Sequence, residues 1–247
     1  MNAAARMSTR GEDETVKQRS GWLIPITVFV VTAGLSALFL LYYLVPIPAS
    51  FIEEHPAPTS RSDPVSLSIG SLKMTIPANY IIYARARQGG AQKQVELFTT
   101  FPDFKGYSDW YASDFTGNAP DSPAIFMLMR QDQFKITEAE RLSRIYLGYV
   151  SHPAGTEGPF GLTQYTFRDD SGYRGEDLFV GQMDGQPIVL RCVRFSIQVP
   201  SPSCLRDMKL PHGVTLSYRF KRAHLGHWLD IAQGMKALMQ SFGAKTK

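Results

Sequence analysis

Closely spaced carboxylates are the first residues in this sequence that could do chemistry. Asp169–Asp170 and Glu176–Asp177 flank a short turn that contains Gly172. Paired carboxylates can transfer protons or bind a hard cation. Adjacent residues of a strand point to opposite faces, however, so these neighbours are not partners by default. A solvated hairpin turn is therefore the favoured interpretation.

Motifs with catalytic spacing are missing from the sequence. Neither a G-x-S-x-G turn, a phosphate-binding glycine loop nor an H-E-x-x-H pair occurs. His224 and His227 have a spacing that lets them share a helix face, but no metal-binding motif includes them. We therefore predict no cofactor and no metal ion. A dispersed active site of an envelope hydrolase or transferase acting on glycan or lipid, built from residues such as His152, Asp170 and Glu176, is the alternative.

An aromatic segment, residues 98–115, is the least ordinary stretch of the chain. Seven of its eighteen residues are Phe, Tyr or Trp, and prolines, glycines and charges lie among them. Such a mixture is typical of a partly exposed segment, where aromatic rings anchor a protein partner or a glycan. The alternative is a lid of rings folded onto the core. The candidate binding residues are Phe101, Phe104, Tyr107, Trp110 and Tyr111.

A basic set on two predicted strands is the second candidate site. If those strands pair, their cations would form a stripe suited to anionic headgroups or polymers. A solvated sheet face is the plainer interpretation. The set comprises Arg191, Arg194, Arg219, Lys221 and Arg222.

Cys192 and Cys204 are the two cysteines of the chain. Both follow the apolar segment 22–45, which would place them outside the cytoplasm. An even number of cysteines in an oxidising compartment predicts a disulfide. Pro200 and Pro202 lie between them, so the bridge would close a loop that proline already stiffens.

Residues 22–45 contain no charged residue and no histidine. As a helix this run would be roughly 36 Å long, enough to cross a hydrocarbon layer of ~30 Å. It is longer than the apolar region of a cleavable signal peptide, so an uncleaved signal-anchor helix in contact with membrane lipid is predicted. Ala33, Gly34 and Ala37 give this helix a face of small residues that would allow a homo-oligomer to form.

Basic residues before the span set its orientation. Arg6, Arg10, Lys17 and Arg19 precede it, whereas the first basic residue after it is Arg61. The richer side stays in the cytoplasm. No N-x-Ser/Thr sequon occurs, which favours a bacterial envelope. We therefore predict a single-pass inner-membrane protein with a cytoplasmic N-terminus and a periplasmic C-terminal domain.

The predicted organisation has five parts. Residues 1–21 form a disordered cytoplasmic tail, 22–45 the transmembrane helix, 46–64 a proline-rich linker, 65–243 an extracytoplasmic domain and 244–247 a tail. Within the domain, alternating apolar residues predict a hairpin over 65–76. Further strands are predicted at 94–100, 124–130, 160–168, 176–182, 187–198 and 213–221.

Two helices are predicted beside these strands. Thr137 and Glu140 form a capping box before an apolar pattern that runs to Tyr149. The second helix, 223–242, has one apolar stripe and is amphipathic. The predicted fold is α+β, a mainly antiparallel sheet with helices packed on one face. A β-sandwich with a terminal helix is the alternative.

The net charge and the lack of catalytic motifs limit the classes of function that fit this sequence. Removing the four basic and three acidic residues of 1–21 leaves 22 basic and 19 acidic residues, a formal charge of +3. That value and the compartment exclude nucleic acid as a partner. The sequence favours a non-catalytic binding or assembly module of the bacterial cell envelope with a protein partner.

Overall fold

The computed structural model describes residues 21–44, 55–132 and 136–244. It divides into two compact units, 1–53 and 54–247. Nearly all of the predicted N-terminal tail, residues 46–54 of the predicted linker and residues 245–247 lie outside the described residues.

The first unit contains one helix, α1 (Leu23–Leu44). Its segment Leu23–Tyr43 has a mean hydropathy of 2.3, and none of it is buried against the protein. The helix is long and apolar enough for a membrane anchor or a signal sequence. No face of the helix carries a charged side chain, which suits a lipid environment.

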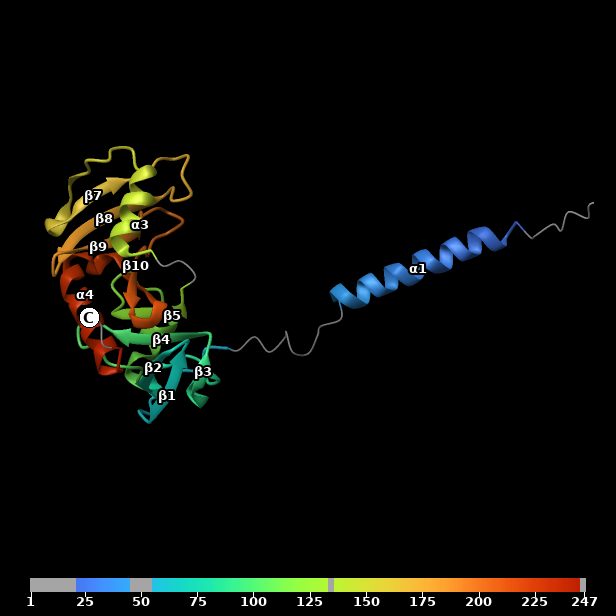
Figure 1. The fold of residues 1–247 in the computed structure, drawn as a ribbon, viewed down its shortest axis with the longest axis horizontal. Coiled ribbons are helices and arrows are strands. Elements are labelled where there is room, and N and C mark those ends of the chain that lie inside the picture. The colour runs from blue at the N-terminus through green and yellow to red at the C-terminus, as the bar shows by residue number, and fades with distance from the viewer. Residues whose placement is uncertain (1–20, 45–54, 133–135, 245–247) are drawn as a thin grey trace, which may run out of the picture. The chain divides into compact units, whose positions relative to one another are not determined.

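An eight-stranded antiparallel sheet forms the body of the second unit (Figure 1). In spatial order its strands are β4 (Gln94–Thr100), β5 (Ala124–Gln131), β11 (Val214–Lys221), β10 (Ser203–Leu210), β9 (Gln186–Val193), β8 (Glu176–Met183), β7 (Thr163–Thr166) and β6 (Thr156–Glu157).

A smaller three-stranded sheet lies beside β4 (Figure 1). Its hairpin of β1 (Pro64–Ile69) and β2 (Leu72–Pro77) confirms the predicted one. The turn uses Gly70 at a positive φ of 57°, a conformation that suits glycine. The third strand, β3 (Gly90–Gln92), runs parallel to β1.

Helices cover both faces of the large sheet. α4 (Trp228–Ser241), which follows a 3-10 segment at Arg222–His227, buries Ile231, Met235 and Met239 in the main core. α3 (Glu138–Arg144) lies on the opposite face, because Val189 belongs to the apolar cluster beside α3 and its neighbour Leu190 to the core beneath α4. The expectation of helices on one face is corrected accordingly. The shorter elements are α2 (Ala112–Thr116) and 3-10 turns at Ala78–Tyr80, Ala86–Gln88, Asp109–Tyr111, Tyr146–Gly148, Pro159–Gly161 and Pro211–Gly213.

The α+β fold is thus confirmed, with several boundaries displaced. The capping box of Thr137 and Glu140 is present, but the helix ends at Arg144 and a 3-10 turn follows. The predicted strand 160–168 shrinks to β7 because Phe160 has a left-handed φ of 59°. The predicted strand 187–198 ends at Val193, and β10 was not predicted at all.

Residues 55–63, the later part of the predicted linker, belong to the second unit. The Ala57 backbone N–H donates to the Ile82 carbonyl at 3.1 Å, and the Ala78 N–H donates to the Asp63 carbonyl at 2.8 Å. This segment therefore approaches the domain beside β4.

Candidate functional site

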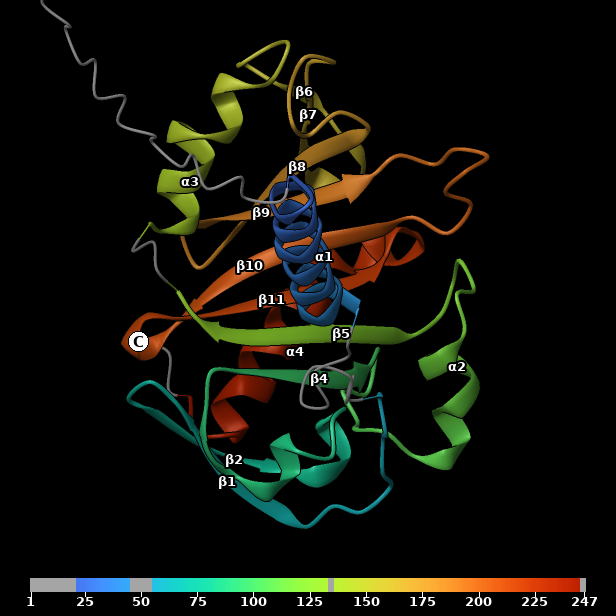
Figure 2. The same ribbon diagram turned by 90° about the vertical axis from the view of Figure 1, so that its right-hand side faces the viewer.

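A disulfide closes the base of the loop between β9 and β10. Cys192 and Cys204 are directly opposed on these strands and are bonded, which confirms the predicted bridge. β9 and β10 pair at this position and at Arg191–Leu205. Residues 194–202 therefore form a loop whose two ends are held together covalently, and Figure 2 shows it as an orange projection beyond the sheet.

The β9–β10 loop (residues 194–202) carries two exposed apolar side chains. Phe195 is 71% exposed and Ile197 is 91% exposed. Ser196 and Val199 exchange backbone hydrogen bonds of 3.3 and 3.0 Å between them, so the loop has an ordered turn. Exposed apolar residues on an ordered, stapled loop are typical of an interaction surface.

The predicted aromatic binding residues do not form one exposed patch. Phe101 and Phe104 pack against the main core. Tyr107 and Tyr111 join a cluster around Phe98, over β4 and β5. Four of the five rings therefore contribute to a lid, the alternative stated above.

Trp110 is the exception among these rings, because it is 87% exposed. It lies in the 3-10 turn Asp109–Tyr111 that leads directly into α2. In Figure 2, α2 and the β9–β10 loop lie at the same edge of the sheet.

A groove lies between these two segments, on the sheet face opposite α4. We call it the outer groove. Its first part is a cavity of about 550 Å³ between Asn118, in the loop after α2, and Ser201, in the β9–β10 loop. A second cavity of about 510 Å³ continues toward β4. The residues that line both cavities are Phe126, Leu205 and Arg219.

Two cations of the predicted basic set lie in the outer groove without an ion-pair partner among the described residues. Arg219 is exposed and has no hydrogen-bond or ion-pair partner among the described residues. The Lys221 ammonium donates to the Asn118 side-chain oxygen and, at 2.7 Å, to the Ser201 hydroxyl. Burial, followed by the positive charge of Arg219, lowers the pKa of Lys221. These two cations thus lie close together without a carboxylate.

The remaining arginines of the basic set are neutralised. Arg191 also lines the outer groove, but it pairs with Glu176 at 2.9 Å. Arg194 and Arg222 both pair with Asp177, each at 2.8 Å. Arg222 stacks on Phe179, a residue of the core beneath α4. The structure therefore brings Arg191, Arg219 and Lys221 together and places Arg194 elsewhere.

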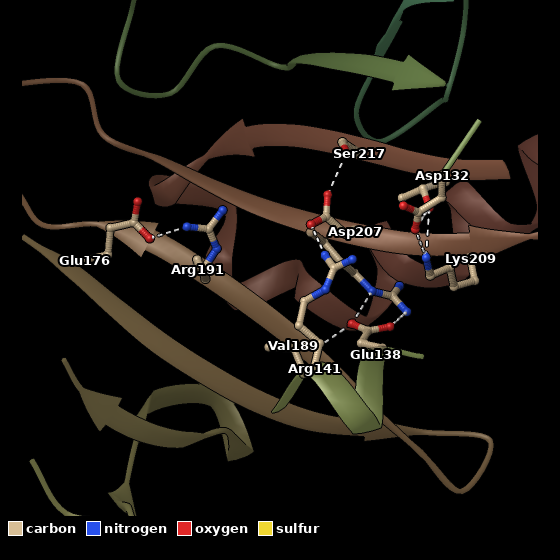
Figure 3. A network of polar contacts seen from close by, with 11 residues as sticks. Asp132, Glu138, Arg141, Glu176, Val189, Arg191, Asp207, Lys209 and Ser217 are labelled. Carbon is tan, nitrogen blue, oxygen red and sulfur yellow. Dashed lines mark hydrogen bonds and ion pairs between the residues drawn. The ribbon is translucent and has the colours of Figure 1, made fainter. Parts of the chain in front are cut away.

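A network of ion pairs fixes α3 beside the outer groove (Figure 3). Glu138 accepts hydrogen bonds from Arg206 at 3.0 and 3.1 Å and from the Val189 backbone N–H at 2.6 Å. Arg141 pairs with Asp207. Because β9 and β10 diverge here, Glu138 supplies the acceptor that a neighbouring strand would otherwise provide.

The residues of the alternative enzymatic hypothesis are not connected by any described contact. His152 is exposed, Asp170 pairs with Arg168, and Glu176 pairs with Arg191. In the part of the chain that the structure describes, no group of three or more His, Cys, Asp or Glu side chains could hold a metal ion. His224 instead contacts the carbonyls of Asp121 and Ser122.

Sequence reasoning missed Phe195 and Ile197. The apolar alternation continues through them to Val199 and so predicts a strand there. The signal that could have distinguished them is the predicted bridge, because Cys192 is the last residue of β9 that pairs with β10, and β9 ends at Val193.

Comparison with protein families and with curated proteins finds no match. Among solved structures, Smlt3025, an immunity protein of the Stenotrophomonas maltophilia type IV secretion system, has a similar fold. The TM-score is 0.53 at 15% sequence identity, over 74% of this chain and 94% of that chain. At this identity the likeness concerns the fold.

Proposed function

We propose that this chain is a membrane-anchored, non-catalytic binding module of the bacterial envelope, and that it neutralises a toxic protein by binding it. The observation that carries the proposal is the outer groove with exposed Trp110, Phe195 and Ile197 in the segments beside it. The unpaired Arg219 lies within the groove.

The residue types fit a protein partner. Trp and Arg are enriched among the residues that dominate protein–protein binding, and exposed apolar side chains gain free energy when a partner covers them. The disulfide holds the β9–β10 loop in one arrangement before binding, which reduces the entropy lost on association.

The similar solved structure suggests what kind of protein is bound. Smlt3025 is described as an immunity protein of a secretion system. By analogy, the partner of this chain would be a toxin delivered into the envelope. Such an inhibitor needs no active site, which agrees with the unconnected His152, Asp170 and Glu176.

The apolar helix and the disulfide indicate an extracytoplasmic domain. We infer further that α1 stays attached as an inner-membrane anchor and that the domain faces the periplasm. An anchor would keep the binding module at the membrane surface and raise its local concentration there.

A competition experiment between cells tests this function. A strain lacking the chain is grown in contact with its unmodified parent, and its survival is counted. We expect the deletion strain to be killed and the full-length chain to restore its survival. Insertions in the parent that abolish killing would then identify the toxin. Equal survival of the deletion strain and the parent would contradict the proposal.

A further inference from the structure

The carboxylates around the outer groove already have partners. Glu176 pairs with Arg191. Asp207 pairs with Arg141 and also accepts from the Ser217 hydroxyl. Farther along the groove, Glu96 accepts a hydrogen bond of 2.7 Å from Gln94. Each of these carboxylates therefore already has a hydrogen-bond partner, and neither Arg219 nor Lys221 has a carboxylate partner among the described residues.

Arg219 lies between two apolar side chains on the same sheet face. In the strand register it is directly opposite Leu205 of β10 on one side and Phe126 of β5 on the other. All three residues line both parts of the outer groove. A guanidinium held between apolar neighbours is well suited to bidentate pairing with a carboxylate, because the surface that excludes water strengthens the pair.

Lys221 lies at the end of the outer groove, between the loop after α2 and the β9–β10 loop. Its ammonium donates to two neutral oxygens, of Asn118 and Ser201, and lysine has three donors. One donor is therefore available to an incoming group. Because the positive charge of Arg219 contributes to lowering the pKa of Lys221, a bound anion would relieve the repulsion between the two cations.

We propose that the outer groove binds an acidic segment of the partner protein, in which a carboxylate pairs with Arg219 and Lys221 and a neighbouring apolar side chain contacts Phe126 and Leu205. This inference rests on the proposed function, since it names the chemistry of the partner at that site. We take the segment to be a peptide because the groove has an apolar floor, and because exposed Phe195 and Ile197 of the β9–β10 loop and Trp110 of the turn before α2 lie near it. A phosphate headgroup would use the cations and leave the apolar floor uncovered.

Peptide selection tests the chemistry without knowledge of the toxin. The full-length chain, held in nanodiscs of neutral phosphatidylcholine, is presented with a displayed library of random peptides. We expect the selected peptides to place Asp or Glu next to an aromatic or aliphatic residue. For a selected peptide, changing its acid to the amide should weaken binding at least about tenfold.

Variants of the chain assign the binding to the groove. R219E should weaken binding of the same peptide at least about tenfold, and R219K should weaken it less because it keeps the charge but loses the bidentate geometry. R130E is the matched control. Arg130 is exposed on the same sheet face, on the adjacent strand, and lines neither cavity, so this variant should bind as the unmodified chain does.

Several outcomes would overturn the inference. The selected peptides could lack acidic residues, or R219E could bind them as well as the unmodified chain does at equal thermal stability. The chain could instead prefer phosphatidylglycerol vesicles to the peptides, or it could form a dimer that R219E abolishes. The proposed function fails separately, in the competition between cells. If the R219E chain restores survival fully, the immunity role stands and the acidic segment does not.

Discussion

At the scale of single residues, Glu138 joins a helix to a split sheet. It is the first residue of α3, and its carboxylate contacts both the Val189 N–H of β9 and the Arg206 guanidinium of β10. Arg206 is only 4% exposed, so its buried positive charge needs the opposite charge that Glu138 supplies. Burial lowers the pKa of Arg206, but Tyr218 and Glu138 together outweigh this effect, so the pKa is raised, in agreement with that pairing.

E138Q is expected to destabilise the domain strongly. The amide keeps the shape of the side chain but leaves Arg206 buried without an opposite charge, at a cost of about 3–5 kcal/mol. Denaturation by urea measures the change. The double variant E138L/R206M, which removes both charges, should recover much of the loss. A stable E138Q variant would show that the pair does not hold α3 on the sheet.

The capping box gives a pH-dependent contribution to stability. Hydrogen bonds from the backbone and then the hydroxyl of Thr137 lower the pKa of Glu140 below its ordinary value of 4.5. Because the pKa is lower in the folded state, the ionised carboxylate stabilises the fold above about pH 4.5, and this contribution is lost as the pH falls through the folded-state value.

E140Q should therefore be less stable than the unmodified chain at pH 7, with a difference that narrows toward pH 3. Unfolding midpoints across this range provide the measurement. S143A is the control, since Ser143 is an exposed residue of the same helix, and within the described part of the chain its hydroxyl donates only to the Glu140 carbonyl. A difference between E140Q and the unmodified chain that is constant with pH would contradict this assignment.

At the scale of elements, the β9–β10 loop links the covalent structure to recognition. Its ends are joined at Cys192–Cys204, and its tip presents Phe195 and Ile197 to solvent. A partner that covers this loop would bury its exposed apolar surface, which favours binding. The same side chains contribute little to the core and so little to stability.

The double variant F195S/I197S should bind the toxin more weakly and unfold at an unchanged temperature. Two exposed anchors are removed without opening a cavity, so recognition and stability should separate. Binding to the toxin identified by the competition experiment and thermal unfolding give the two readouts. Unchanged toxin binding would exclude the loop from the interface.

Trp110 and Tyr111 should behave differently although they are adjacent. W110A is expected to weaken toxin binding and leave the unfolding temperature nearly unchanged, because its ring is exposed. Y111A should lower the unfolding temperature, because that ring belongs to the cluster around Phe98. If W110A unfolds the domain instead, Trp110 is part of the lid.

The sequence predicted the elements whose apolar pattern matches their burial. β1 and β2 alternate cleanly, and α4 carries one apolar stripe. β10 escaped prediction because its buried positions include Arg206 between Cys204 and Met208, which breaks the apolar alternation. Only the tertiary pairing with Glu138 makes that arginine a core residue.

The sequence predicted the residue types of the candidate site but not the contacts between them. The residue types of the basic set were visible, but the partners that neutralise Arg191 and Arg194 come from β8 and depend on strand register. The exposure of Trp110 beside four packed rings also depends on the turn that precedes α2.

At the scale of the whole molecule, the chain combines an apolar helix with a stapled α+β domain. The two units have separate tasks in our account, attachment by α1 and recognition by the outer groove. α4 packs on the other face of the sheet and contributes to the main core of the domain.

Hydrogen–deuterium exchange on the complex of the full-length chain with the identified toxin would locate the binding surface. Binding in the outer groove should slow exchange in residues 117–123, 194–202 and 214–221, which border it, and leave exchange in α4 unchanged. Protection confined to α4 and the small sheet, with the groove segments unchanged, would contradict it.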